Sequence, residues 1–176
     1  MQNKKITPSR DFFVEFLKHA KELGTPFQSS THLADAVARE IKGNRIIELG
    51  AGNGNVTRGI LALHPKALVT AFEINSKLLK NLSIIKSSRL KIIKNSAENF
   101  SDYVSDFDCV VSGLPLTSMP EEAVDKILEC AKKARFIQYK YFPERKLLER
   151  YFKSVRGKIV WGNFPPAIVY VCDNNA

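Results

Sequence analysis

The stretch Ile46-Ile-Glu-Leu-Gly-Ala-Gly-Asn-Gly-Asn-Val-Thr57 decides the fold of this chain. A short apolar run, Arg45–Leu49, leads into Gly50, Gly52 and Gly54, and helical spacing follows over Asn55–His64. Glycine lets the chain turn sharply at the end of a strand and lets a ligand approach the backbone. The stretch therefore predicts a strand, a ligand-binding turn and a helix.

The segments that follow alternate between the two kinds of periodicity. Strands are predicted at Ala67–Ile74, Leu90–Lys94, Asp108–Ser112 and Arg135–Tyr141, and helices at Ser76–Ile85, Ala97–Val104, Pro120–Ala134 and Glu144–Lys153. Two last strands, Lys158–Gly162 and Ala167–Cys172, are separated only by a turn, which is too short for a parallel crossover. We therefore expect an α/β fold with a Rossmann-like, seven-stranded, mostly parallel sheet, an antiparallel C-terminal hairpin and helices on both faces.

Composition restricts the class of protein. The chain has 176 residues, of which 44% are hydrophobic, so we expect one domain: N-terminal helices over residues 1–42 and a cofactor-binding core over 43–176. No apolar run approaches the ~18–20 residues of a membrane-spanning helix, and a cytoplasmic protein is expected. Cys109, Cys130 and Cys172 lack disulfide or zinc spacing, so no metal site is expected.

The charge balance indicates a polyanionic partner. The formal net charge is +9, which predicts attraction to nucleic acid or to an anionic lipid surface. Asp11–Leu23 predicts a helix with Phe13 and Phe16 on one face and Lys18 beside it, a profile typical of membrane-interface helices. A helix that covers the core fits the same pattern. A second helix, Thr31–Lys42, is expected to be capped by Ser30 or Thr31.

Two acidic residues flank the glycine turn and define its ligand. A dinucleotide fingerprint would place a third glycine where Asn55 stands, which disfavours NAD. Glu48 would repel a pyrophosphate and attract an ammonium group. Glu73 ends the next strand about 20 residues beyond the glycines, where an acid commonly binds two ribose hydroxyls. An amino acid joined to a nucleoside describes S-adenosylmethionine.

With these residues the sequence resembles the class I S-adenosylmethionine-dependent methyltransferases over roughly Ile41 to Val171. The resemblance implies that S-adenosylhomocysteine is a product and that adenine lies beside the segment after the third strand. Many relatives have Asp where Ser96 stands, so the contact to the adenine amino group can move to Glu98. The implied cofactor-binding residues are Ser29, Ser30, Glu48, Gly50, Gly52, Asn53, Gly54, Glu73, Ile74, Ser96, Ala97, Glu98 and Ser112.

The segment Ser112-Gly-Leu-Pro-Leu116 should border the acceptor, because open α/β sheets bind ligands outside the carboxyl ends of their strands. Adenine and amide N-methyltransferases resemble each other in having Asn or Asp and an aromatic residue here. Ser112 and Gly113 stand at the polar position and Leu116 at the aromatic one, so a stacked planar base is disfavoured.

This variant instead resembles the bacterial phospholipid N-methyltransferases, which methylate phosphatidylethanolamine toward phosphatidylcholine. Phe27–Ala34, Phe136–Tyr141 and Val160–Val171 resemble further segments of that family. The chain departs from the family at Gln28, where proline is usual, and at Lys140, where a small hydroxyl residue is usual. The resemblance implies that the catalytic set is Ser112, Gly113, Leu114, Pro115, Gln138 and Tyr141.

The chemistry of an amine acceptor adds further candidates. An alkyl ammonium must lose its proton before it attacks a methyl group, and Glu98, His32 and Tyr141 are candidate acceptors of that proton. A methylated cation would bind aromatic faces, which Tyr139 and Trp161 can offer, although packing in the core explains both equally well.

The sequence therefore favours a methyltransferase peripheral to the inner face of the membrane, with an anionic membrane surface and an aminophospholipid as partners. Nucleic acid is the less favoured partner, and no obligate protein partner is indicated. Two alternatives stay open: an enzyme like the rRNA adenine N6-dimethyltransferases, and a non-catalytic domain that keeps the cofactor fold and binds RNA or lipid.

Overall fold

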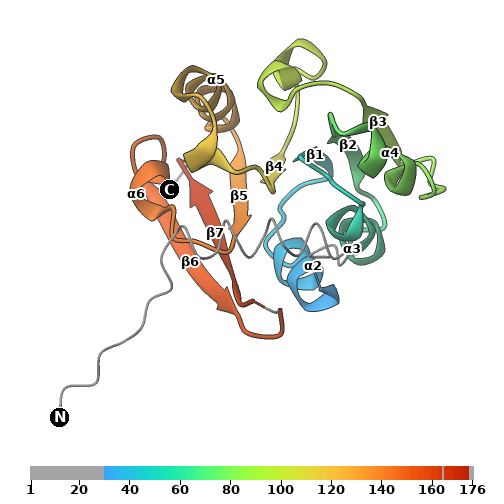
Figure 1. Ribbon diagram of the computed structural model, residues 1–176, viewed down its shortest axis with the longest axis horizontal. Coiled ribbons are helices and arrows are strands. Elements are labelled where there is room, and N and C mark those ends of the chain that lie inside the picture. Colours follow the sequence, from blue (N-terminus) through green and yellow to red (C-terminus); the bar gives the residue numbers. More distant parts are fainter. Residues whose placement is uncertain (1–29, 164, 175–176) are drawn as a thin grey trace.

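The computed structural model describes residues 30–163 and 165–174, and it contains a seven-stranded sheet with the order β3-β2-β1-β4-β5-β7-β6 (Figure 1). The strands are β1 (Arg45–Leu49), β2 (Leu68–Phe72), β3 (Leu90–Ile93), β4 (Cys109–Ser112), β5 (Arg135–Lys140), β6 (Ser154–Val160) and β7 (Ala167–Asp173). Every pairing from β3 to β5 is parallel, whereas β7 is antiparallel to both of its neighbours. The predicted fold class, including the antiparallel hairpin, is confirmed.

Helices cover both faces of this sheet. They are α2 (Thr31–Ala38), α3 (Asn55–Leu63), α4 (Ser76–Leu82), α5 (Glu121–Ala131) and α6 (Arg145–Leu148), with 3₁₀ helices η1 (Ala97–Asp102) and η2 (Leu116–Ser118). Apolar residues of α2 and α3 pack with one face of the central strands, and those of α5, α6 and η1 pack with the other. Each face thus buries its own apolar cluster, as a parallel sheet requires.

The chain departs from the predicted elements where tertiary contacts override local pattern. The helix predicted at Glu144–Lys153 is shortened to α6, because Phe152 turns back to stack on Phe136 with ring centroids 5.3 Å apart. The segment predicted as the helix Ala97–Val104 is the 3₁₀ helix η1, in which i to i+3 spacing buries Ala97 and Phe100 together. The strand predicted to start at Lys158 begins at Ser154.

Two further expectations concern the N-terminal third. Ser30 caps α2, because its Oγ accepts a hydrogen bond from the backbone N of Leu33 at 3.2 Å. The helix predicted at Asp11–Leu23 lies outside the described residues. Among the helices that are described, none has the length and apolar character needed to cross a membrane.

The carboxyl ends of the parallel strands form one edge of the sheet, and backbone hydrogen bonds fix the loops that leave it. The N–H of Gly50 donates to the carbonyl of Phe72 at 2.9 Å, and the N–H of Gly113 donates to the carbonyl of Leu49 at 3.0 Å. The turns after β1 and β4 therefore start at the same level.

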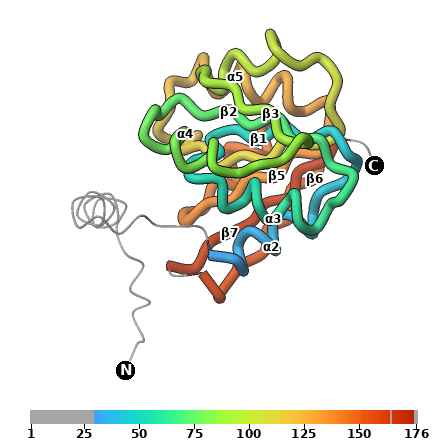
Figure 2. Tube along the Cα trace, turned by 90° about the vertical axis from the view of Figure 1, so that its right-hand side faces the viewer, coloured from blue at the N-terminus to red at the C-terminus, as the bar shows by residue number. Residues whose placement is uncertain are grey.

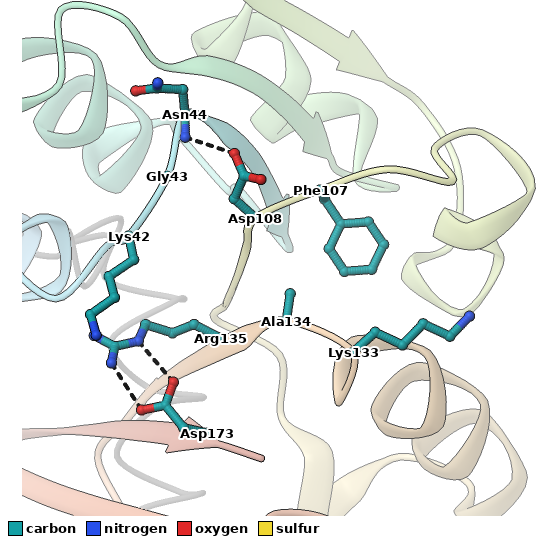
Figure 3. A pocket seen from close by; sticks show the side chains of 9 residues that line it. All are labelled: Lys42, Gly43, Asn44, Phe107, Asp108, Lys133, Ala134, Arg135 and Asp173. Carbon is teal, nitrogen blue, oxygen red and sulfur yellow. Dashed lines mark hydrogen bonds and ion pairs between the residues drawn. The ribbon is translucent and has the colours of Figure 1, made fainter. Parts of the chain in front are cut away.

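The opposite, amino edge carries a hollow of about 440 Å³ (Figure 3). Three of its charged groups, those of Asp108, Arg135 and Asp173, have partners. Arg135 forms a bidentate pair with Asp173 at 2.9 Å, and Asp108 accepts hydrogen bonds from the backbone N–H groups of Asn44 and Arg45. The first pair joins the start of β5 to the end of the antiparallel strand β7, and the second joins the starts of β1 and β4, so both lie at the edge opposite the carboxyl ends.

Candidate active site

The turn between β1 and α3 depends on glycine. Gly50, Gly52 and Gly54 have φ angles of 71°, 60° and 83°, which L side chains rarely adopt. At Gly50 a Cβ atom would also come within 2.9 Å of Leu114 Cδ2, so the loops after β1 and β4 touch there. The chain turns in this way because glycine favours the positive φ angle and leaves room for the close approach of Leu114.

Glu73 joins this turn to the end of β2. Its Oε2 accepts a hydrogen bond from the N–H of Gly52 at 2.8 Å, and its Oε1 accepts one from the N–H of Asn75 at 2.7 Å. A carboxylate has about four lone-pair sites, so Glu73 can still accept further hydrogen bonds. The side chain therefore holds the turn and keeps acceptor capacity toward a ligand.

Glu48 lies buried beside the same turn. Its Oε2 accepts a hydrogen bond from Thr57 Oγ1 at 2.6 Å, and its Oε1 has no hydrogen-bond partner among the described residues. Burial raises the pKa of Glu48 to about 8, partly offset by the hydrogen bond from Thr57 and increased by the negative charge of Glu73. An unpaired buried carboxyl oxygen is a site for a cationic group.

A cavity of about 520 Å³ opens at the carboxyl edge, between the loops after β1, β2, β3 and β4. Nine predicted site residues line it: Gly50, Gly52, Glu73, Ile74, Ser96, Ala97, Gly113, Leu114 and Pro115. Five residues that the sequence did not indicate also line it: Phe72, Asn75, Leu78, Asn95 and Met119. Phe72, Asn75 and Asn95 adjoin predicted residues in the sequence, and this adjacency could have indicated them. No sequence pattern indicates Leu78 or Met119.

The other predicted residues lie away from the surface of this cavity. Ser30 borders a separate hollow between α2 and α3, and Glu98 lies within η1. Ser112 is fully buried, and its Oγ accepts a hydrogen bond from the N–H of Leu114 at 3.3 Å. Asn53 accepts a hydrogen bond on its carbonyl from Arg58, and Gly54 caps α3. Ser29 lies outside the described residues.

A buried carboxylate, Glu144, anchors the loop that carries the predicted catalytic motif. Its Oε2 accepts a hydrogen bond from Gln138 Nε2 at 3.1 Å, and its Oε1 accepts one from Thr117 Oγ1 at 3.1 Å. Lys140 Nζ lies 3.2 Å from the same Oε1. Gln138 Nε2 also donates to the carbonyl of Leu114 at 2.8 Å, so the network reaches the cavity wall.

This network changes the interpretation of two sequence features. Gln138, predicted to be catalytic, supports the loop from behind, because its amide is fully buried and donates to Leu114 and Glu144. Lys140, which departs from the family pattern, neutralises Glu144. No sequence pattern pointed to Glu144, because only the tertiary structure brings it beneath the motif.

The candidate proton acceptors lie in different places. Tyr141 forms a hydrogen bond with Asn163, and burial raises the pKa of its phenol, so the phenol is protonated at neutral pH. His32 is exposed on α2 and faces Gly162, whose Cβ would lie 2.8 Å from the His32 Cγ. Tyr139, which is not one of these candidates, lies with its ring against Gly113, where a Cβ would clash with its Oη.

The chain is similar to known methyltransferases. A model of the methyltransferase domain family matches residues 46–134. The ornithine lipid N-methyltransferase of Singulisphaera acidiphila is 26% identical to this chain over 184 residues, which covers 93% of this chain and 96% of that protein. The match therefore includes the glycine turn and the loop after β4.

Solved structures show the same fold. The precorrin-6Y C5,15-methyltransferase of Geobacter metallireducens superposes with a TM-score of 0.69 and 17% identity, over 84% of this chain and 90% of that chain. The 1,6-didemethyltoxoflavin N1-methyltransferase of Burkholderia thailandensis, solved with S-adenosylhomocysteine, has a TM-score of 0.63 and 16% identity, over 97% and 92% of the two chains. At these identities the likeness concerns the fold.

The residues around the cavity fit S-adenosylmethionine. At the cavity wall, the carboxylate of Glu73 would accept hydrogen bonds from the ribose hydroxyls. The side chain of Ile74, which is 65% exposed, would offer an apolar surface to the nucleoside. The unpaired Oε1 of Glu48 lies near the glycine turn, and the ammonium of an amino acid bound there would favour the ionised form of this carboxyl. When bound, this cofactor supplies an electrophilic methyl group on a sulfonium.

Replacing Glu73 tests its role at the ribose. We expect Glu73→Gln to weaken the binding of S-adenosylhomocysteine by roughly 10- to 100-fold in calorimetry, because charge-assisted hydrogen bonds contribute about 1.5–3 kcal/mol. Glu98→Gln, a matched change outside the cavity lining, should leave the affinity within about twofold. Equal losses of affinity in the two variants would contradict the assignment of the ribose hydroxyls to Glu73.

The raised pKa of Glu48 predicts a pH dependence with a definite sign. Below pH 8 the buried carboxyl is mostly protonated in the free protein, and a cationic ligand favours its ionised form, so binding releases a proton. The affinity for S-adenosylhomocysteine should therefore rise several-fold from pH 6 to pH 7.5, while Glu48→Gln removes this rise. Parallel pH profiles for both proteins would refute the coupling.

The same pKa makes Glu48 a cost to stability at alkaline pH. In the unfolded chain the carboxyl ionises near its ordinary value of 4.5, so the free energy of unfolding falls as the pH rises from 4.5 toward about 8. Glu48→Gln should consequently raise the melting temperature at pH 8 by more than at pH 5, by a few degrees if about 1 kcal/mol is recovered.

The network around Glu144 predicts a strong effect of removing its charge. Glu144→Gln places an amide NH₂ among hydrogen-bond donors and leaves the Lys140 ammonium without its ion-pair partner. We therefore expect the free energy of unfolding, measured with urea, to fall by about 3–5 kcal/mol. Glu149→Gln breaks an exposed pair with Arg145 and should cost less than about 1 kcal/mol. Similar losses of unfolding free energy in the two variants would show that the buried network contributes little to stability.

Proposed function

The chain belongs to the methyltransferase domain family and is an S-adenosylmethionine-dependent methyltransferase, and from this premise we propose that its acceptor is the amine of an aminolipid headgroup. The observation that carries the proposal is the loop after β4, which borders the cofactor cavity with Gly113, Leu114 and Pro115. This wall is built from backbone and apolar groups, which suits a small, non-planar acceptor.

The position at which adenine methyltransferases carry an aromatic residue supports the choice of acceptor. Leu116 stands there, is only 2% exposed and belongs to the apolar cluster with Val124 and Phe136. No ring is therefore offered to a planar base at this position. A primary amine needs no stacking partner, since it is positioned through its hydrogen bonds and its attached chain.

The residues near this wall can orient an amine without a dedicated base. Burial raises the pKa of the Tyr139 phenol far above neutrality, so beside Gly113 it remains a neutral hydroxyl that can accept or donate a hydrogen bond. Exclusion of water by Leu114 and Met119 would lower the pKa of an ammonium group and favour the attacking form. Positioning and desolvation would then provide most of the rate enhancement.

The lipid assignment draws support from the relative that acts on ornithine lipid, which also carries an amine. Phosphatidylethanolamine shares that group, and the resemblance of the acceptor loop to phospholipid N-methyltransferases favours it. The net charge of +9 is suited to an anionic surface. We accordingly propose a cytoplasmic protein that works peripherally at the inner face of the membrane.

The proposal is tested by methyl transfer from radiolabelled S-adenosylmethionine. The full chain is incubated with vesicles of phosphatidylglycerol mixed with phosphatidylethanolamine or with ornithine lipid, and in parallel with transcribed ribosomal RNA. We expect label in the lipid extract, and chromatography of that extract gives the headgroup and the number of methyl groups. Glu73→Gln serves as the control for cofactor-dependent transfer.

Two results would overturn the proposal. Label in RNA alone would assign the acceptor loop to a nucleic acid base. Label in neither substrate, together with normal binding of S-adenosylhomocysteine, would exclude both headgroups as acceptors. Label in ornithine lipid but not in phosphatidylethanolamine would support an aminolipid acceptor and would identify ornithine lipid, instead of phosphatidylethanolamine, as the substrate.

A further inference from the structure

The tip of the β6–β7 hairpin exposes an aromatic side chain that the cofactor site does not use. Trp161, directly after β6, is 76% exposed, and Ile159 is 49% exposed. The alternative that Trp161 packs in the core is thus wrong. A tryptophan in a folded protein is usually largely buried, so this degree of exposure needs an explanation.

The hairpin tip lies on the same edge of the sheet as the cavity. Both β5 and β6 are antiparallel to β7, so β6 runs in the direction of β5 and of the other parallel strands. Its carboxyl end, and Trp161 after it, consequently lie at the edge where Gly50 and Gly113 follow their strands. Figures 1 and 2 both show the hairpin projecting at one end of the molecule.

The turn is held by contacts that leave Trp161 outside. Asn163 is 2% exposed, and its Oδ1 accepts a hydrogen bond from the N–H of Ser30 at 2.9 Å. Its Nδ2 donates to the carbonyl of Pro165 at 2.8 Å. Gly162 packs against the ring of His32, with no room for a Cβ. Trp161 is therefore exposed beside residues, Gly162 and Asn163, that have fixed contacts with α2 and its cap.

Two basic side chains precede the tip on β6. Arg156 and Lys158 are exposed on β6, which is the edge strand of the sheet, and Ile159 follows them. Tryptophan is enriched where proteins meet the membrane–water interface, because its ring is apolar and its N–H is polar. Lysine and arginine beside an anionic surface each contribute favourable electrostatic energy. The combination of Trp161, Ile159 and these two cations matches the surface of an anionic bilayer.

We propose that the β6–β7 tip, defined as residues 156–163, is a membrane-docking element that inserts Trp161 and Ile159 into the headgroup layer of an anionic membrane. Docking in this way would turn the carboxyl edge of the sheet, with its cavity, toward the lipid headgroups. The inference rests on the proposed function, which requires an acceptor that stays in the bilayer.

Tryptophan fluorescence tests the insertion directly, because Trp161 is the single tryptophan of the chain. The full chain is titrated with vesicles of phosphatidylcholine and phosphatidylglycerol, which contain no aminolipid acceptor. We expect a blue shift of the emission and quenching by lipids brominated on the acyl chains. A chain that binds the vesicles without either change would overturn the proposal, as would a failure to bind.

A reporter at the opposite edge provides the matched control. Leu68 starts β2 at the amino edge and is 56% exposed, so Leu68→Trp combined with Trp161→Phe places the only indole far from the tip. We expect this double variant to bind vesicles with its emission unchanged. A blue shift equal to that of the natural chain would mean that the tip is not the inserted element.

Removal of the side chain tests its contribution to affinity. Trp161→Ala should lower the partitioning of the protein into these vesicles roughly tenfold, since a large apolar side chain stays in water, and leave the affinity for S-adenosylhomocysteine unchanged. Unchanged partitioning would refute the docking role. An emission change with single-stranded RNA but none with vesicles would also refute it and indicate stacking on a base.

These readouts are independent of methyl transfer. Insertion of Trp161 without label in any aminolipid would retain the docking element and overturn the acceptor. Methylated lipid without insertion of Trp161 would retain the acceptor and overturn the docking element.

Discussion

One row of the sheet, formed by Leu49, Phe72 and Ser112, fixes the geometry of the whole site. Leu49 pairs with Phe72 on one side and with Ser112 on the other, and the next residue of each strand begins a loop of the cavity. A slip of one residue between parallel strands would turn every side chain of the slipped strand to the other face. The two apolar clusters therefore hold the register, and the register brings Gly50, Glu73 and Gly113 together.

The two halves of the cavity are supported in different ways. On the cofactor side, Glu73 binds backbone N–H groups of its own and the neighbouring loop, so the chain that contacts the cofactor also carries its support. On the acceptor side, the support comes from behind, through Gln138 and the buried pair of Glu144 and Lys140. Buried ion pairs demand complete hydrogen bonding, which restricts how the acceptor loop can move.

The sequence reveals the parts of this arrangement that local chemistry dictates. The glycines reveal the turn because other residues rarely adopt their φ angles, and Glu73 is found from its separation along the sequence from that turn. Glu144 could not be found, because the structure brings it beneath Leu114 through the path of the chain after β5. The exposure of Trp161 was equally hidden, since Ile159, Val160 and Trp161 form a continuous apolar run of the kind found in buried strands.

The strand order at the end of the sheet explains why the exposed tip and the cavity share an edge. Had β6 paired with β5 in sequence order as an antiparallel neighbour, its carboxyl end would lie at the amino edge, beside Asp108 and Arg135. Insertion of β7 between β5 and β6 restores the parallel direction of β6 and carries Trp161 to the edge of the cavity. The same insertion makes β6 the edge strand, where Arg156 and Lys158 stay in solvent and oppose pairing with another sheet. A single topological feature thus places an aromatic side chain, basic groups and the methyl-transfer cavity on one side of the molecule.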